Sequence, residues 1–131
     1  MKLLLAIDGS ELSEAAVRTV IAQQRPRDTE VKLLHAIPVD ARDGQGRPAR
    51  KLVDRSSAVL RSAGFKVETT ILKGATSDAI IDAAAEWDAD LIVLGSHVRT
   101  AAKRFLFGSV SDAVVHQAHC SVELVRIRSL H

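Results

Sequence analysis

Apolar and polar positions along the chain follow two periods, one typical of buried strands and one typical of amphipathic helices. Continuous apolar runs and two-residue alternation predict strands at 2–7, 30–37, 66–72, 90–95 and 122–127. Apolar residues at helical spacing predict helices at 10–24, 49–63, 75–87 and 109–117. Each predicted strand is therefore separated from the next strand by one helix.

This alternation predicts an α/β fold in which a parallel sheet carries helices on both faces, because each right-handed crossover uses a helix to return the chain. A length of 131 residues fits a single doubly wound domain covering residues 1–131. Ligands of such sheets bind beyond the carboxyl ends of the strands, where the strand order reverses. We therefore expect Asp8-Gly9-Ser10 and Gly95-Ser96 to face each other across one cleft.

The segment from Leu91 to Ser109 carries the most informative chemical pattern of the chain. A buried strand runs directly into Gly95-Ser96, and a second small pair, Gly108-Ser109, follows a basic loop. Glycine lets the backbone approach a ligand closely, and the N–H groups that begin the next helix favour an anion such as phosphate. An ordinary strand-to-helix connection capped by Ser109 explains the same residues. Both interpretations stay open for this segment taken alone.

Composition narrows the classes of function. A formal net charge of +2, with three Phe, one Trp and no Tyr to stack on bases, argues against nucleic-acid binding. No apolar run approaches the roughly 20 residues that cross a bilayer, so no membrane insertion is expected. The single cysteine, Cys120, excludes an intramolecular disulfide and fits a reducing cytoplasm. His116, His119 and Cys120 lack the second ligand cluster of a zinc site, so no metal site is predicted.

Several candidate residues also have a purely structural explanation. Asp8 either orients the turn into the first helix or contacts a ligand. Helix capping explains Ser10 better than nucleophilic catalysis, because no ordered triad accompanies it. His35 lies within an apolar strand and is interpreted as a core histidine. Arg99 belongs either to a phosphate-binding loop, where it neutralises anionic oxygens, or to a solvated basic loop.

With these motifs in view, the chain resembles the universal stress protein family over nearly its whole length. The likeness rests on four segments, 5–10, 33–36, 90–97 and 107–110. The resemblance implies a five-stranded sheet of order 3-2-1-4-5, a homodimer and, in nucleotide-binding members, the signature G-x2-G-x9-G-[ST]. Gly95 and Gly108-Ser109 match this signature, whereas Val98 stands at the position of the middle glycine.

Carried over residue by residue, the resemblance implies a site for ATP with Mg²⁺. Three positions would lie along the adenosine: Asp8, Ala36 and Leu94. The ribose and phosphates would be bordered by Gly95, Gly108, Ser109 and Val110, with Arg99 in the same loop. The implied protein is a homodimeric stress-response regulator that switches with nucleotide occupancy. It is at most a weak ATPase, because no positioned base accompanies the loop.

The alternative is a dimeric interaction protein of the same family that binds no nucleotide, and Val98 favours this alternative. Under both hypotheses we expect the last strand, Val122 to Ile127, at the homodimer interface, because an edge strand is otherwise an exposed template for pairing. A further protein partner is implied, but the sequence does not identify it.

Overall fold

The computed structural model describes residues 1–37, 46–95 and 109–127 of the chain. These residues form strands and α-helices in alternation, with a short 3-10 turn (η1, Pro26–Asp28) after the first helix. The elements in chain order are β1 (Lys2–Ala6), α1 (Glu11–Gln23), β2 (Glu30–Ile37), α2 (Gly46–Ser62), β3 (Lys66–Lys73), α3 (Thr76–Trp87), β4 (Leu91–Gly95), α4 (Ser109–Gln117) and β5 (Ser121–Val125).

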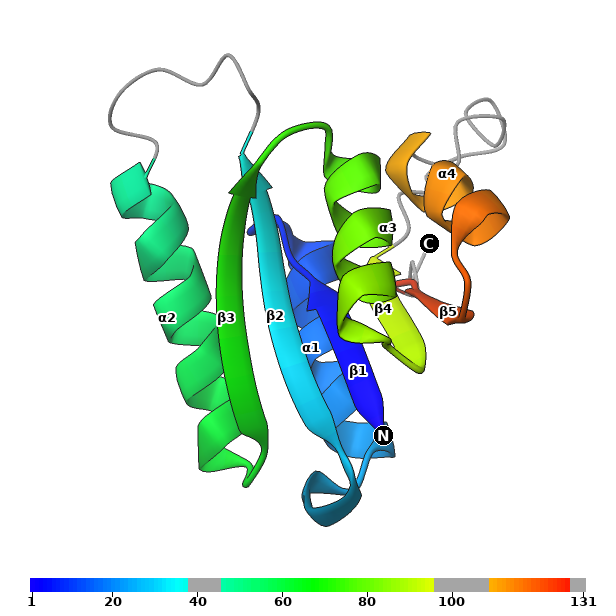
Figure 1. The fold of residues 1–131 in the computed structure, drawn as a ribbon. Coiled ribbons are helices and arrows are strands. Elements are labelled where there is room, and N and C mark those ends of the chain that lie inside the picture. Colours follow the sequence, from blue (N-terminus) through cyan, green and yellow to red (C-terminus); the bar gives the residue numbers. More distant parts are fainter. Residues whose placement is uncertain (38–45, 96–108, 128–131) are drawn as a thin grey trace.

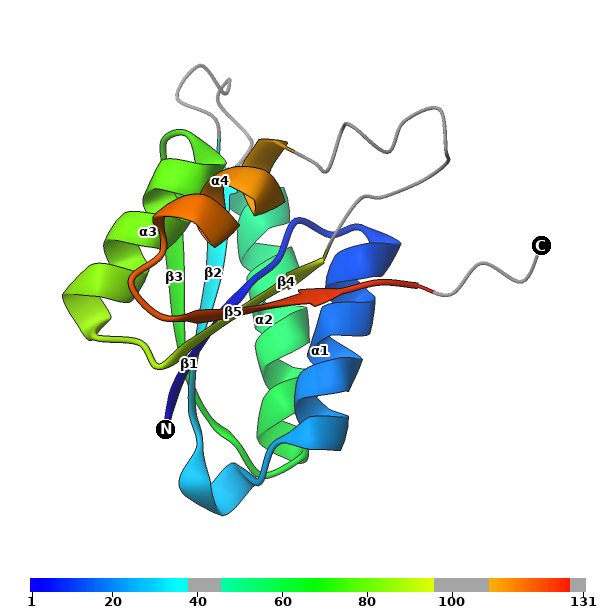
Figure 2. The same ribbon diagram turned by 90° about the vertical axis from the view of Figure 1, so that its right-hand side faces the viewer.

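The sheet has five strands in the order β3-β2-β1-β4-β5, and all neighbouring strands are parallel. In the centre of the sheet, Leu5 of β1 pairs with Leu33 of β2 on one side and with Val93 of β4 on the other. Helices α1 and α2 cover one face, and α3 and α4 cover the opposite face (Figures 1 and 2). The predicted fold class and strand order are confirmed.

The core consists of one apolar layer on each face of the sheet. Leu3 and Leu5 contribute to the layer under α1 and α2, whereas Leu4 contributes to the layer under α3 and α4. All three leucines are 0 % exposed. A central strand of a parallel sheet is covered on both sides, which explains why β1 appears in the sequence as a continuous apolar run.

Two helix starts differ from the predictions. Helix α2 begins at Gly46 and not at Ala49, so Pro48 lies in its first turn. Proline is tolerated there, because the N–H that it lacks would have no partner within the helix. Helix α3 begins at Thr76 and not at Ala75. The residue that precedes the helix, Ala75, is the N-cap, and it provides no side-chain hydrogen bond.

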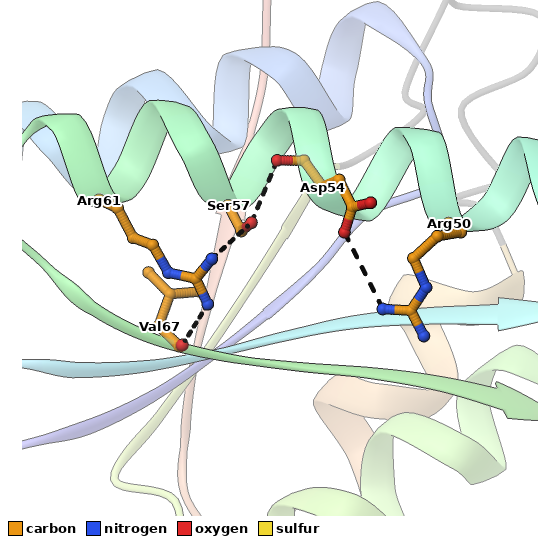
Figure 3. A network of polar contacts seen from close by, with 5 residues as sticks. All are labelled: Arg50, Asp54, Ser57, Arg61 and Val67. Carbon is orange, nitrogen blue, oxygen red and sulfur yellow. Dashed lines mark hydrogen bonds and ion pairs between the residues drawn. The ribbon is translucent and has the colours of Figure 1, made fainter.

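Strand β3 forms one edge of the sheet, and a side chain from α2 covers part of that edge (Figure 3). Gly74 donates its N–H to the Ile37 carbonyl of β2, so the alternate residues that include Val67 direct their backbone groups outward. Arg61 of α2 donates to the outward Val67 carbonyl at 2.9 Å and to the Ser57 hydroxyl at 3.4 Å. A cation on an edge carbonyl opposes pairing with another strand at that position.

Candidate functional site

A pocket of about 220 Å³ lies at the carboxyl ends of β1 and β4. Its lining comes from the residues that end these two strands and from the first two turns of α1, α3 and α4. Because every strand is parallel, these three helices all begin at the same edge of the sheet (Figures 1 and 2). The topology therefore brings three helix N-termini to the position at which doubly wound folds bind ligands.

The structure brings five of the predicted site residues together in this pocket: Asp8, Leu94, Gly95, Ser109 and Val110. Ala36 is not part of the lining; it lies near the end of β2 and packs against the apolar layer under α3 and α4. Two predicted residues, Arg99 and Gly108, lie outside the described residues, as does Val98. The expected cleft between the turn after β1 and the end of β4 is present.

The turn from β1 into α1 is held by hydrogen bonds between neighbouring residues. Gly9 has φ +84°, a conformation that favours glycine. Asp8 accepts the Ser10 N–H through Oδ1 at 2.9 Å, and Ser10 Oγ accepts the Ser13 N–H at 3.2 Å as the N-cap of α1. Ser13 Oγ accepts the Gly9 N–H at 3.1 Å. The capping role of Ser10 and the turn-orienting role of Asp8 are thus confirmed, and a ligand contact of Asp8 stays a prediction.

Packing against helix α1 explains why residue 95 is a glycine, and the sequence pattern did not reveal this contact. A Cβ added at this position would lie 2.7 Å from Leu12 Cβ and 3.0 Å from the Leu12 carbonyl carbon and oxygen. Helix α1 therefore packs directly on the backbone at the end of β4, and only glycine permits this approach. The close approach of helix and strand explains this glycine without a ligand.

The inner wall of the pocket is apolar and its polar groups are mostly hydroxyls. Ile80 of α3 is 0 % exposed and Leu94 of β4 is 4 % exposed, and both line the pocket. Thr76, one helical turn before Ile80, lies exposed on the α3 side. Sequence analysis missed the contribution of α3, although a helix that follows a parallel strand necessarily begins at this edge of the sheet.

The described lining contains the carboxylate of Asp8 but no Lys, Arg or His. Its attraction for an anion thus rests on the backbone N–H groups at the helix starts. Within the described ranges no group of three or more His, Cys, Asp or Glu side chains could hold a metal ion. The described part of the site is therefore suited to bind and orient a ligand, and it contains no evident acid–base pair for catalysis.

Two titratable residues near the strand ends have structural roles. His35 Nδ1 lies 2.8 Å from the Ile7 carbonyl and must donate to it, because a carbonyl oxygen only accepts. This bond joins β2 to the end of β1, which supports the structural role expected of His35, although its side chain is half-buried and not part of the buried core. Cys120 packs against the apolar layer under α3 and α4. Burial, and to a lesser extent the charge of Asp90, raises the pKa of its thiol.

His116 of α4, which the sequence offered as a metal ligand, lies beside a carboxylate of the same helix. His116 Nε2 lies 3.3 Å from Asp112 Oδ1, one helical turn earlier on the exposed face of α4.

No helix in the described part of the chain has the length and apolar character needed to cross a bilayer.

The chain is similar in sequence and in fold to known proteins. The model of the universal stress protein family matches residues 1–126. Universal stress protein MJ0531 of Methanocaldococcus jannaschii is 30 % identical over 140 aligned residues, which cover 95 % of this chain and 81 % of the relative.

Two solved structures of the same fold have nucleotides bound. The universal stress protein from Archaeoglobus fulgidus in complex with dAMP is 26 % identical, with a TM-score of 0.79 and coverage of 95 % of this chain and 97 % of that chain. A universal stress protein in complex with cAMP is 25 % identical, with a TM-score of 0.77 and coverage of 96 % of both chains. Together, the family match, the strand order and these relatives show that the chain belongs to the universal stress protein family.

Proposed function

We propose that this chain is a stress-response protein that binds an adenine nucleotide in the pocket at the carboxyl ends of β1 and β4. The observation that carries the proposal is the composition of one pocket, in which an apolar wall faces hydroxyl groups and the beginnings of three helices. The two relatives solved with dAMP and with cAMP support an adenine nucleotide as the ligand class.

Different parts of the pocket suit the purine and the phosphate of such a ligand. Ile80 and Leu94 offer the apolar surface on which a purine packs. Ser109 begins α4, where the backbone N–H groups of the first turn and the helix dipole favour a phosphate. The volume of about 220 Å³ is below the range of about 300–1,000 Å³ that is usual for ligand pockets. The described pocket therefore matches a nucleoside better than a complete triphosphate, and binding of ATP with Mg²⁺ would require the basic loop at 96–108.

In the proposed mechanism, nucleotide occupancy switches a surface that a partner protein recognises. The chain would act in the cytoplasm as a homodimeric regulator and not as an efficient enzyme. Strand β5 is an edge strand that pairs with β4 alone, so alternate residues of β5 direct their backbone groups away from the sheet. These outward groups are the proposed pairing edge of the homodimer.

A second candidate function is a dimeric interaction protein that binds no nucleotide. The packing of Leu12 on Gly95 favours it, because this glycine is required even in the absence of a ligand. Val98, in place of the middle glycine of the signature, favours it as well. The two candidates differ in whether the pocket is ever occupied by a nucleotide.

Calorimetric titration distinguishes the two functions. Adenosine, AMP and ATP, the last with and without Mg²⁺, are titrated into the protein at several salt concentrations. Saturable 1:1 binding that persists in high salt supports the nucleotide site, since nonspecific attraction to basic groups is screened. The variant Thr76→Phe places a ring on a residue that lines the pocket, whereas Ser77→Phe makes the same change on an adjacent residue that does not line it.

We expect Thr76→Phe to weaken nucleotide binding and Ser77→Phe to leave it unchanged. Heat signals that vanish in high salt, or that are the same in both variants, would remove the support for this pocket. The interaction protein without nucleotide would then be the better description.

A further inference from the structure

The charges of this chain are separated between two helices on opposite faces of the sheet. Helix α2 contains five of the 18 Lys and Arg residues and one acidic residue, Asp54. Helix α3 contains three acidic residues and no basic residue. Because the two helices cover different faces (Figures 1 and 2), the small net charge of +2 conceals a basic surface and an acidic surface.

Each of these helices presents a row of three charges with the same spacing. The basic stripe on α2 consists of Arg47, Lys51 and Arg55, and the acidic stripe on α3 consists of Asp78, Asp82 and Glu86. All six residues are exposed. Residues four apart are neighbours on the surface of a helix, so each stripe is a row about 12 Å long that is inclined to the helix axis.

The six stripe side chains have no polar side-chain partner among the described residues. None of them forms an ion pair or a side-chain hydrogen bond with another described residue. Other charges on α2 do have partners (Figure 3): Arg50 lies 3.9 Å from Asp54, and Arg61 donates to the Val67 carbonyl. The stripes are therefore distinct from the network that fixes α2 on β3.

Helix stability does not explain the end charges of the two stripes. Arg47 lies in the first turn of α2, which has no acidic residue, and Glu86 lies in the last turn of α3, which has no basic residue. The partial charge at a helix start disfavours a cation, and that at a helix end disfavours an anion. Both residues thus oppose the dipole of their own helix, and each would be stabilised by a partner of opposite charge.

We propose that the basic stripe of one copy binds the acidic stripe of a second copy, with the two helices antiparallel. This orientation places Arg47 opposite Glu86 and the start of α2 beside the end of α3. The helix dipoles and the side-chain charges are then both complementary. The contact uses different surfaces on the two copies, so it is heterologous and can continue from one copy to the next. The inference is independent of what the pocket binds.

The small binding free energy of this contact makes the association reversible and not permanent. Exposed ion pairs contribute little individually and are screened by salt. We expect association at low ionic strength and high protein concentration. Raising the salt concentration from about 0.01 M to about 1 M shortens the screening length from about 30 Å to about 3 Å. The association constant should then fall by about tenfold, which lies within the range expected for losing three exposed pairs.

Charge reversal tests the pairing directly by sedimentation velocity on the full chain. One variant converts the basic stripe to glutamates (Arg47→Glu, Lys51→Glu, Arg55→Glu), and a second converts the acidic stripe to lysines (Asp78→Lys, Asp82→Lys, Glu86→Lys). Each variant alone carries two stripes of the same sign and should lose the salt-sensitive association, whereas the proposed homodimer through β5 should remain. An equimolar mixture of the two variants should associate again, and so should a third variant that carries both reversals.

The reversed residues are all exposed, so circular dichroism and thermal midpoints should remain near those of the wild type. A milder pair, Lys51→Gln and Asp82→Asn, removes charge without reversal and should weaken association by a smaller factor. Wild-type protein whose sedimentation is unaffected by salt would overturn the proposal. Failure of the mixture to associate, with both variants folded, would overturn it as well.

Discussion

The substitution Gly95→Ala tests whether the packing of α1 on β4 determines this glycine. An alanine Cβ at this position would lie 2.7 Å from Leu12 Cβ and 3.0 Å from the Leu12 carbonyl carbon and oxygen. Two of these three atoms belong to the helix backbone, so rotation of the Leu12 side chain cannot relieve the overlap. Helix α1 must move away from the sheet, which loosens the apolar layer that contains Val17 and Val93.

The expected loss of stability in Gly95→Ala follows from this geometry. Overpacking of a core costs about 1–3 kcal/mol, and a clash with backbone belongs in the upper half of that range. For a chain of this size, about 2–3 kcal/mol corresponds to a decrease in thermal midpoint of roughly 6–12 °C. The midpoint is measured by calorimetry without any ligand. Gly46→Ala is the matched control, because an added Cβ there has no atom within 4 Å, and it should leave the midpoint unchanged or slightly raised.

A Gly95→Ala protein as stable as the wild type would refute the packing explanation. If that variant also failed to bind a nucleotide that the wild type binds, Gly95 would instead be required for the ligand. A lower thermal midpoint without ligand supports the structural role, whatever the pocket binds.

Three further results are expected. Asp8→Asn should keep the thermal midpoint, because an amide oxygen can still accept the Ser10 N–H, whereas Asp8→Ala should lower the free energy of unfolding by about 1 kcal/mol in denaturant titrations. If nucleotide binding needs positive φ at residue 98, Val98→Gly should tighten AMP binding about tenfold in calorimetry. The raised pKa of Cys120 means that the neutral thiol stabilises the fold below pH 9.0 and that this contribution is lost as the pH rises through the higher folded pKa. Unfolding measured across this window should show a smaller loss of stability in Cys120→Ser.

The fold could be predicted from the sequence because its strands and helices have different apolar periods. The residues of β1 and β4 are buried on both faces, so their apolar runs are continuous and unambiguous. The start of α2 could not be predicted in the same way. Gly46 and Pro48 are typical of turns when taken in isolation, yet both are tolerated in the first turn of a helix.

The candidate site was predicted where it depends on strand ends and missed where it depends on packing. Asp8 and Gly95 follow directly from the rule that ligands bind at the carboxyl ends of parallel strands, whereas Leu94 was implied by the family resemblance. A glycine that lets a ligand approach and a glycine that lets a helix approach look identical in sequence, so the contact of Gly95 with Leu12 was not foreseen. Ile80 reaches the pocket only because of how α3 lies across the sheet, which no local pattern encodes.

The surroundings of Trp87 give the protein a built-in optical probe. It is the single tryptophan of the chain, and it ends α3 at the opposite end of the helix from Thr76. The ammonium groups of Lys2 and Lys32 lie 5.6 Å and 5.0 Å from the centre of its ring, and Lys2 also donates to the Trp87 carbonyl at 3.2 Å. Its emission therefore reports whether the end of α3 remains attached to β1 and β2. Ile80, the pocket residue nearest to Trp87 on this helix, lies about 10 Å away along the helix axis. Fluorescence can therefore follow unfolding in the presence of a ligand that does not contact the ring.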